Sequence, residues 1–491
     1  MKIKCAFKIF VFLITINSFS SWGKNDVESQ LLVSPTAISF TLEGGTSEII
    51  VTSNTRWNIN NSASWLQLSQ VAGNSNTVIQ VNATTNYTNT TRTAELIINI
   101  PRGQTRRILV SQVPAIYPSY NTSPIAPDAT GMSSNAIQLA ANIKLGWNLG
   151  NTLEAMNNNT TGNETAWGNP VTTKALIDLV KASGFNAVRL PCSWNGYLAD
   201  SATAKIKPSW LNHIKEVVQY CVDNDMYVLL NIHWDGGWLD ENINPGKQDK
   251  TKAKQKAFWE QIATHLRDFD EHLMFASANE PPVDDATKME ILNSYHQAFV
   301  DAVRSTGGRN SYRVLVVQGP GTDIDKTEKL MNKLPSDLTP NRMMVEVHYY
   351  GPSQFCLLRE DATWGKMFYY WGNRYHSTTD ASRNATWGEE DYVVAEFQKM
   401  KAKFVDKGVP VLLGEFGALR HTALMGDNLT LHLASRAYWD KYITQQARAH
   451  GMLPFYWDEG SIGNDGFGIL DRKNLKVFDQ QVLNALIEGA K

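Results

Sequence analysis

The sequence predicts a (β/α)8 barrel that is preceded by a small all-β, immunoglobulin-like sandwich. Across residues 132–491, eight apolar strand-like runs alternate with helical patterns, and eight such units close a barrel. In residues 31–113, short runs alternate between apolar and polar residues, which is typical of an antiparallel sandwich. Between them, residues 114–131 carry four prolines among Ser, Thr and Asn, a composition typical of an extended connector. We therefore expect two domains joined by a Pro-rich linker.

Residues 1–22 have the layout of a secretory signal peptide. Three lysines precede a short apolar run from Ile9 to Ile16, and small polar residues follow it. This run is too short to cross a membrane. We expect an exported protein that is secreted or lies in the cell envelope of a Gram-negative bacterium, either in the periplasm or at the outer-membrane surface. The sequence leaves open whether the protein is anchored to that surface.

The composition limits the class of partner. The net charge is −2 and charged residues make up 19% of the 491 residues, so the chain has no basic stripe for nucleic acid. The 15 tryptophans exceed what a core requires, and flat indole rings often stack on sugar rings. We expect a monomer with an uncharged partner.

The first domain carries no cluster of titratable residues. Its strand runs include Ile38 with Phe40 and Leu96 with Ile98, separated by turn signals such as Gly44-Gly45. Its motifs resemble those of a BACON domain, in this order: Ala37 to Phe40, Trp57 to Ile59, Ser64 to Leu66 and Leu109 to Gln112. This resemblance leaves two roles open, glycan binding and a spacer that holds the next domain away from a surface.

The second domain supplies the barrel elements. The expected strands are Lys144–Asn148, Ala187–Leu190, Tyr227–Ile232, Met274–Ala278, Arg313–Val317, Met344–Val347, Val411–Gly414 and Leu453–Trp457. The expected helices include Thr173–Ala182, Pro208–Val222, Thr251–Phe269, Thr287–Ser305, Glu396–Lys407 and Leu429–His450. An open doubly wound sheet is the alternative, but no Gly-rich phosphate loop follows the first strand.

Two apolar runs end at a glutamate. Leu273 to Pro281 stops at Asn279 and Glu280, and Pro410 to Gly417 stops at Glu415. In a barrel, all strand C-termini meet at one rim, so these carboxylates should meet there. The other residues at predicted strand ends, which we expect to bind substrate, are Asn148, Arg189, His233, Trp234, His348, Tyr350 and Trp457.

Two carboxylates without a metal or cofactor are the machinery of glycoside hydrolysis. One protonates the leaving oxygen, and the other attacks the sugar or activates water. Glu415, near a cation and a phenol, should stay ionised, whereas the less well paired Glu280 can hold a proton. A metal site is the rival interpretation, but the spacing of His and acidic residues fits no metal motif. We expect no metal and no cofactor.

Six motifs resemble glycoside hydrolase family 5, from about Met132 to the C-terminus. They lie at 186–191, 231–235, 278–281, 347–350, 414–417 and 456–458. Residues 145–154 and 167–170 are similar to the endoglucanase subfamily that includes xyloglucanases, lichenases and carboxymethylcellulases. The resemblance implies a retaining enzyme with Glu280 as general acid/base and Glu415 as nucleophile.

The resemblance also implies roles for the surrounding residues. Arg189 and Tyr350 would hold the nucleophile, and Asn279 would bind the sugar 2-hydroxyl. His233, His348 and Trp457 would contact the sugar at the cleavage subsite.

The substrate is expected to be a β-glucan, with xyloglucan favoured because this type of barrel occurs with a BACON module. The long segment 351–392 holds nine aromatic residues and is expected to be a binding loop. Its aromatic wall is expected to be extended by Trp194, Tyr197, Trp234 and Trp238. Cellulose, mixed-linkage glucan and β-mannan remain alternatives. A non-catalytic glycan-binding protein would have lost one of the two glutamates, and both are present.

Overall fold

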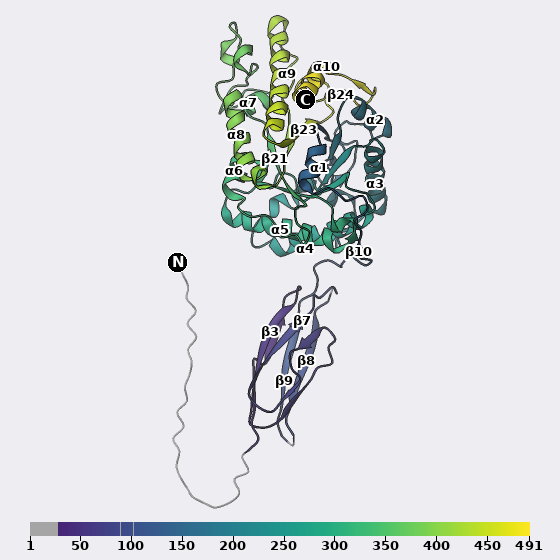
Figure 1. Cartoon of the computed structure of the whole chain (residues 1–491), viewed down its shortest axis with the longest axis vertical. Coiled ribbons are helices and arrows are strands. Elements are labelled where there is room, and N and C mark those ends of the chain that lie inside the picture. Colours follow the sequence, from purple (N-terminus) through teal and green to yellow (C-terminus); the bar gives the residue numbers. More distant parts are fainter. Residues whose placement is uncertain (1–27, 89, 102) are drawn as a thin grey trace, which may run out of the picture. The chain divides into compact units, whose positions relative to one another are not determined.

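The computed structural model describes residues 28–88, 90–101 and 103–491 (Figure 1). The predicted signal peptide, residues 1–22, lies outside this part. The chain divides into two compact units, one that ends at Ala115 and one that runs from Ile116 to Lys491. Within the described residues, no helix has the length and apolar character needed to cross a membrane.

The first unit is the predicted sandwich. One sheet has the order β1-β3-β7-β5 and the other has the order β2-β9-β8-β4-β6. The strands are β1 (Leu31–Ser34), β2 (Ala37–Phe40), β3 (Gly45–Ser53), β4 (Trp57–Asn60), β5 (Leu66–Leu68), β6 (Ala72–Gly73), β7 (Thr77–Ala83), β8 (Arg92–Asn99) and β9 (Thr105–Gln112). Alternate residues such as Ile49, Val51, Ile79 and Val81 are fully buried between the sheets, as the period-2 pattern predicts.

The second unit contains a closed barrel of eight parallel strands, which confirms the predicted fold class. They are β11 (Gly146–Leu149), β14 (Ala187–Leu190), β17 (Tyr227–Asn231), β18 (Leu273–Ala276), β20 (Leu315–Gln318), β21 (Met343–Tyr349), β22 (Val411–Phe416) and β23 (Met452–Asp458). Each predicted strand overlaps one of them. Short strands lie outside the barrel: β10 (Ile125–Pro127), β12 (Met156–Asn157), β13 (Thr161–Gly162), β15 (Leu198–Asp200), β16 (Lys205–Ile206), β19 (Gly307–Gly308), β24 (Leu470–Asp471) and β25 (Lys476–Val477).

Helices surround the strands (Figure 1). All six helices named from the sequence are present: α2 (Lys174–Ala182), α3 (Pro208–Asp223), α4 (Gln248–Leu266), α5 (Ala286–Ser305), α8 (Glu390–Lys403) and α9 (Gly426–Ala449). The helices α1 (Ala136–Asn142), α6 (Ile324–Leu330), α7 (Ser353–Cys356) and α10 (Gln480–Gly489) were not predicted. Helix starts follow local chemistry, since Thr173 and Asp285 accept hydrogen bonds from the backbone of the first turns of α2 and α5.

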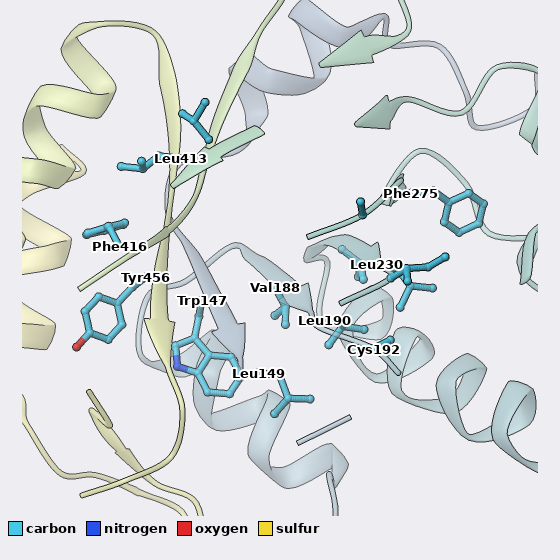
Figure 2. Close-up of a cluster of buried hydrophobic side chains, with 14 of the residues drawn as sticks. Trp147, Leu149, Val188, Leu190, Cys192, Leu230, Phe275, Leu413, Phe416 and Tyr456 are labelled. Atoms are coloured by element: carbon cyan, nitrogen blue, oxygen red, sulfur yellow. The ribbon is translucent and has the colours of Figure 1, made fainter. Parts of the chain in front are cut away.

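Side chains alternate between the inside and the outside of the barrel. Val188 and Leu190 of β14 point outward and join the apolar layer that packs against the helices, part of which is shown in Figure 2. Ala187 points inward and packs in a smaller cluster with residues of α1. The backbone of α1 bonds to Asn341 and Asn186, which precede β21 and β14. Helix α1 therefore closes the N-terminal end of the barrel, and the C-terminal rim stays available for a site.

The Pro-rich segment differs from the prediction of a simple connector. Its later part belongs to the barrel unit, since β10 pairs with β19 in parallel. The backbone N–H of Tyr120 donates to the buried Glu260 carboxylate at 2.7 Å, and its hydroxyl donates to the Thr203 carbonyl. Local sequence patterns cannot predict these partners, because they lie far along the chain.

Candidate active site

A β-bulge in β22 makes the Glu415 side chain point into the barrel. Val347 of β21 pairs with Leu413, but the next residue, His348, pairs with Glu415, so Gly414 has no partner. The bulge places Leu413 in the outer apolar layer, whereas Glu415 faces inward beside His348. A Cβ atom on Gly414 would lie 2.0 Å from the Glu346 carboxylate, so only glycine fits at this position.

The structure brings the two predicted catalytic carboxylates together. One oxygen of Glu280 and one of Glu415 lie within 4.8 Å of each other at the C-terminal rim. This separation fits a retaining mechanism, whose carboxyl groups lie about 5–5.5 Å apart, and leaves no room for the water that inversion needs between them. The Glu415 side chain is buried and the Glu280 side chain is 45% exposed.

Arg189 contacts Glu415 and two further polar residues of the site. Its guanidinium is fully buried and donates to Glu415 at 2.8 Å and to Asn279 at 2.7 Å. It also forms an ion pair with Glu346, with 2.9 Å between Nε and the carboxylate. Tyr350 donates to the other oxygen of Glu415 at 3.0 Å. Arg189 and Tyr350 thus lie on opposite oxygens of Glu415, but the burial of Arg189 does not fit the expectation that it also binds substrate.

Asn148 does not face the site, so its expected role in substrate binding is corrected. The side chain is fully buried, and its amide donates to the carbonyls of Gly414, Phe455 and Tyr456. Its Oδ1 accepts a hydrogen bond from Arg189 at 2.9 Å. Asn148 therefore fixes the bulge and orients Arg189 from below.

Glu346 is a residue that the sequence analysis missed. It lies on β21, two residues before His348, and its side chain is fully buried. Its carboxylate contacts Arg189, His348 and Gln318. The signal that could have identified it is its position. Glu346 and His348 on β21 and Tyr350 directly after it are spaced by two, a spacing that places side chains on the same face.

His348 lies between three carboxylates. Its Nδ1 is 2.7 Å from Glu280 and 3.6 Å from Glu415, and its Nε2 is 3.2 Å from Glu346. Burial opposes the charged form of this imidazole, but the three carboxylates outweigh it and raise the pKa of His348 to about 9.

The charges of the catalytic pair differ from the expectation. Burial raises the pKa of Glu415 above its usual value, against the opposing effects of His348, Arg189 and Tyr350. Partial burial of Glu280 is outweighed by the hydrogen bond and charge of His348, which keep the pKa of Glu280 below its usual value. Glu280 does have fewer close hydrogen-bond partners than Glu415, as expected. The expectation that it holds its proton is not met in the free enzyme, because His348 stabilises its ionised form.

A flat aromatic surface adjoins the catalytic pair. The rings of His233 and Trp457 lie parallel, with centroids 5.9 Å apart, and both are partly exposed. Burial, together with the charges of Arg189 and His348, holds the pKa of His233 well below its usual value, so this ring is neutral. Trp234, also partly exposed, follows His233 in the chain. Exposed flat rings of this kind are suited to packing on a sugar.

In the loop between β21 and β22, some aromatic side chains are buried and others are exposed. Phe355, Tyr370 and Trp371 are fully buried, whereas Trp364 is 63% exposed and Trp387 is 42% exposed. Tryptophans 194 and 238, which were expected to line the cleft, are buried as well. Only part of the predicted aromatic wall can therefore reach a ligand.

Glu280, His348 and Glu415 also have the spacing of a metal-binding cluster among the described residues. Their hydrogen bonds favour acid–base chemistry instead, because both His348 nitrogens already contact carboxylates and Glu415 is held by Arg189 and Tyr350. The acid–base function of this cluster is therefore the one that its contacts support.

Comparison with known proteins agrees with this geometry. Residues 150–462 match the model of the cellulase family, glycosyl hydrolase family 5, and residues 30–115 match that of a viral BACON domain. A xyloglucan-specific endo-beta-1,4-glucanase of Bacteroides ovatus is 33% identical over 467 residues, which cover 92% of this chain and 91% of the relative.

Solved structures are similar as well. A Bacteroides ovatus family 5 xyloglucanase in complex with a XXXG heptasaccharide superposes with a TM-score of 0.70 at 32% identity, covering 94% of this chain and all of that one. A broad specificity endoglucanase from Ruminococcus champanellensis with bound cellotriose has a TM-score of 0.61 at 32% identity, covering 72% and 98% of the two chains. On the family match, the relatives and the paired carboxylates at the barrel rim, this chain belongs to glycosyl hydrolase family 5.

Proposed function

We propose that this protein is a retaining endo-β-1,4-glucanase that cleaves xyloglucan. The observation that carries the proposal is the pair of carboxylates within 4.8 Å, each in a different hydrogen-bonding environment. In the first step, a Glu415 oxygen attacks the anomeric carbon while Glu280 gives a proton to the leaving glycosidic oxygen. In the second step, Glu280 takes a proton from water, and that water releases the sugar from Glu415.

The neighbouring residues support both steps. Arg189 and Tyr350 hold the Glu415 oxygens in place and stabilise their charge. Asn279, which is held by Arg189 at 2.7 Å, is positioned beside the nucleophile for contact with the sugar 2-hydroxyl. The strengthening of such a contact in the transition state contributes several kcal/mol in this class of enzyme.

Support for xyloglucan comes from relatives. The xyloglucan-specific relative from Bacteroides ovatus matches both units of the chain, whereas the broad specificity endoglucanase covers 72% of it. Activity on cellulose or mixed-linkage β-glucan is the second candidate, since an endoglucanase of broad specificity shares the same barrel. Mannan cleavage has no observation in its favour.

The test is hydrolysis of xyloglucan, mixed-linkage β-glucan, carboxymethylcellulose and β-mannan by the wild type and by Glu415→Gln. We expect the highest kcat/KM on xyloglucan and internal cleavage from the first minutes of reaction. Removing the nucleophile should reduce kcat by at least about 10³-fold, since the covalent route is lost. Equal turnover by the two proteins would contradict the nucleophile assignment, and equal rates on all glucans would favour broad specificity.

We further propose that the protein is exported and acts as a monomer outside the cytoplasm, at the cell surface or in the surrounding medium. Support comes from the leader-like composition of residues 1–22 and from a polymeric substrate that is too large to enter a cell. Activity confined to the cytoplasmic fraction of the producing cell would contradict this proposal.

A further inference from the structure

A chain of hydrogen bonds fixes which nitrogen of His348 carries a permanent proton. The backbone N–H of Ala278 donates to Gln318 Oε1 at 2.8 Å, so the Gln318 amide group must point its Nε2 toward Glu346, at 2.6 Å. Glu346 is thereby an acceptor on one oxygen. Its other oxygen forms the ion pair with Arg189 and faces His348 Nε2. Glu346 is therefore an ionised carboxylate, and Nε2 of His348 carries a hydrogen.

The other nitrogen of His348 shares a single proton with the general acid. Its Nδ1 lies 2.7 Å from Glu280 Oε1. Because Nε2 keeps its hydrogen, this contact has two forms: a charged imidazole that donates to ionised Glu280, or a neutral imidazole that accepts from protonated Glu280. Both forms hold one proton between the two groups.

We propose that Glu346 is a positioning residue that makes His348 the store of the general acid's proton. In the free enzyme, the proton rests on His348 Nδ1. When glucan covers the partly exposed Glu280 carboxylate, the charged form loses solvation and the proton moves to Glu280 Oε1. His348 becomes neutral, keeps its Nε2 hydrogen on Glu346, and Glu280 then protonates the leaving oxygen. This inference rests on the proposed function and concerns the source of its proton.

Among the residues that the structure describes, three carboxylates and one guanidinium surround His348. Glu280 follows β18, Glu346 lies on the same strand, and Glu415 comes from β22. The cation Arg189 from β14 pairs with Glu346 and Glu415, and the neutral His233 lies beyond it. Tyr350 donates to Glu415. The anions outnumber the cation around this imidazole, which is why it can hold a proton in alkaline solution.

The first experiment measures the pH dependence of kcat/KM on xyloglucan. The alkaline limb of the wild type should report loss of the shared proton and lie far above that of an ordinary carboxylic acid. In Glu346→Gln, the imidazole loses an anionic neighbour, so this limb should move to lower pH by about one unit. Glu346→Asp keeps the charge and should keep the limb. An unmoved limb in Glu346→Gln overturns the proposal.

A matched control separates this effect from damage to the fold. Asp440 is also a fully buried carboxylate, but it lies in α9 outside the site. Asp440→Asn should leave both limbs in place, whatever it does to stability. A merely structural role of Glu346 would lower kcat at every pH without moving a limb, and this outcome also overturns the proposal.

A second measurement needs only the wild type. In a 15N NMR titration of the His348 ring, Nε2 should remain protonated throughout, and Nδ1 should lose its proton on the alkaline side, near pH 9. Loss of the proton from Nε2, or titration near pH 6.5, overturns the proposal. Failure to cleave any glucan would overturn the proposed function instead, and the titration result would still stand.

Discussion

Burial of Glu415 raises its pKa, whereas Tyr350 and Arg189 lower it. Glu415 has almost no contact with solvent, and burial alone would favour its neutral, unreactive form. A phenol on one oxygen and a guanidinium on the other stabilise the charged form. The balance still leaves the pKa of Glu415 above its usual value. As the pH falls, Glu415 should therefore become protonated, and activity should be lost, at a higher pH than if this glutamate were exposed.

The Tyr350→Phe variant tests this balance. Glu415 must be ionised to attack, so activity falls as the pH drops through its pKa. Loss of a hydrogen bond to the ionised form, worth about 1 kcal/mol, raises that pKa further and moves the acid limb of kcat/KM to higher pH by about 0.7 unit.

Tyr349 provides the control for this variant. It is the neighbouring residue on β21, and its buried hydroxyl has no hydrogen-bond partner in the described part of the chain. Tyr349→Phe should leave the acid limb where it is in the wild type. An identical shift in both variants, or none in either, would show that the Tyr350 hydroxyl does not set the charge of Glu415.

At the scale of elements, the order of strands and helices could be predicted, but the side of β22 on which Glu415 lies could not. Apolar runs and their polar ends located all eight strands and placed Glu280 and Glu415 at one rim. Strict alternation along β22 would put Glu415 on the same face as Leu413, toward the helices. The bulge at Gly414 reverses this. Asn148 holds the bulge by donating to the Gly414 carbonyl, a long-range contact that no local pattern reveals.

Buried polar residues escaped prediction for a similar reason. Glu346 sits within an apolar strand, and its partners Arg189 and Gln318 come from other strands. Asn148 was identified as a strand-end residue, but its burial, and hence its supporting role, depends on β22 and β23. Spacing indicates which residues share a face; long-range contacts decide what each of them does.

The loop between β21 and β22 is the element where substrate length should be sensed. Trp364 is the most exposed aromatic residue of this loop among those described. We expect Trp364→Ala to raise KM for polymeric glucan about three- to tenfold, the loss of one stacking contact, with kcat unchanged.

Two comparisons check the Trp364 prediction. KM for a short aryl β-cellobioside should not change, because such a substrate does not extend beyond the cleavage subsite. Trp371→Ala, in the same loop but fully buried, should instead destabilise the fold by about 3–5 kcal/mol. If Trp364→Ala changes KM equally for the short and the long substrate, this tryptophan does not bind the distal part of the chain.

At the scale of the whole molecule, the first unit should be removable at Ala115, whereas a deletion that extends to residue 131 should destabilise the barrel unit. Deletion of residues 1–115 ends at the boundary between the units, and we expect kcat/KM on soluble xyloglucan to stay within about twofold. Deletion of residues 1–131 removes β10 and the Tyr120 backbone donor from the buried Glu260 carboxylate. An unsatisfied buried acceptor costs about 1–3 kcal/mol, which should lower the Tm of a barrel of this size by about 1–4 °C.

Differential scanning calorimetry of the two truncated proteins decides between these outcomes. Equal barrel transitions would show that residues 116–131 are a plain linker, as the sequence alone had suggested. A loss of activity with the shorter deletion would show that the sandwich unit takes part in hydrolysis of a soluble chain.

The glycine at position 414 has a consequence for recognising active members of this family. A methyl group there would push the Glu346 carboxylate aside and with it the contacts of Arg189 and His348. A homologous chain that keeps both catalytic glutamates but replaces this glycine should therefore be suspected of being a pseudoenzyme. Screening of genomes for competent glucanases should check this small residue along with the acidic pair.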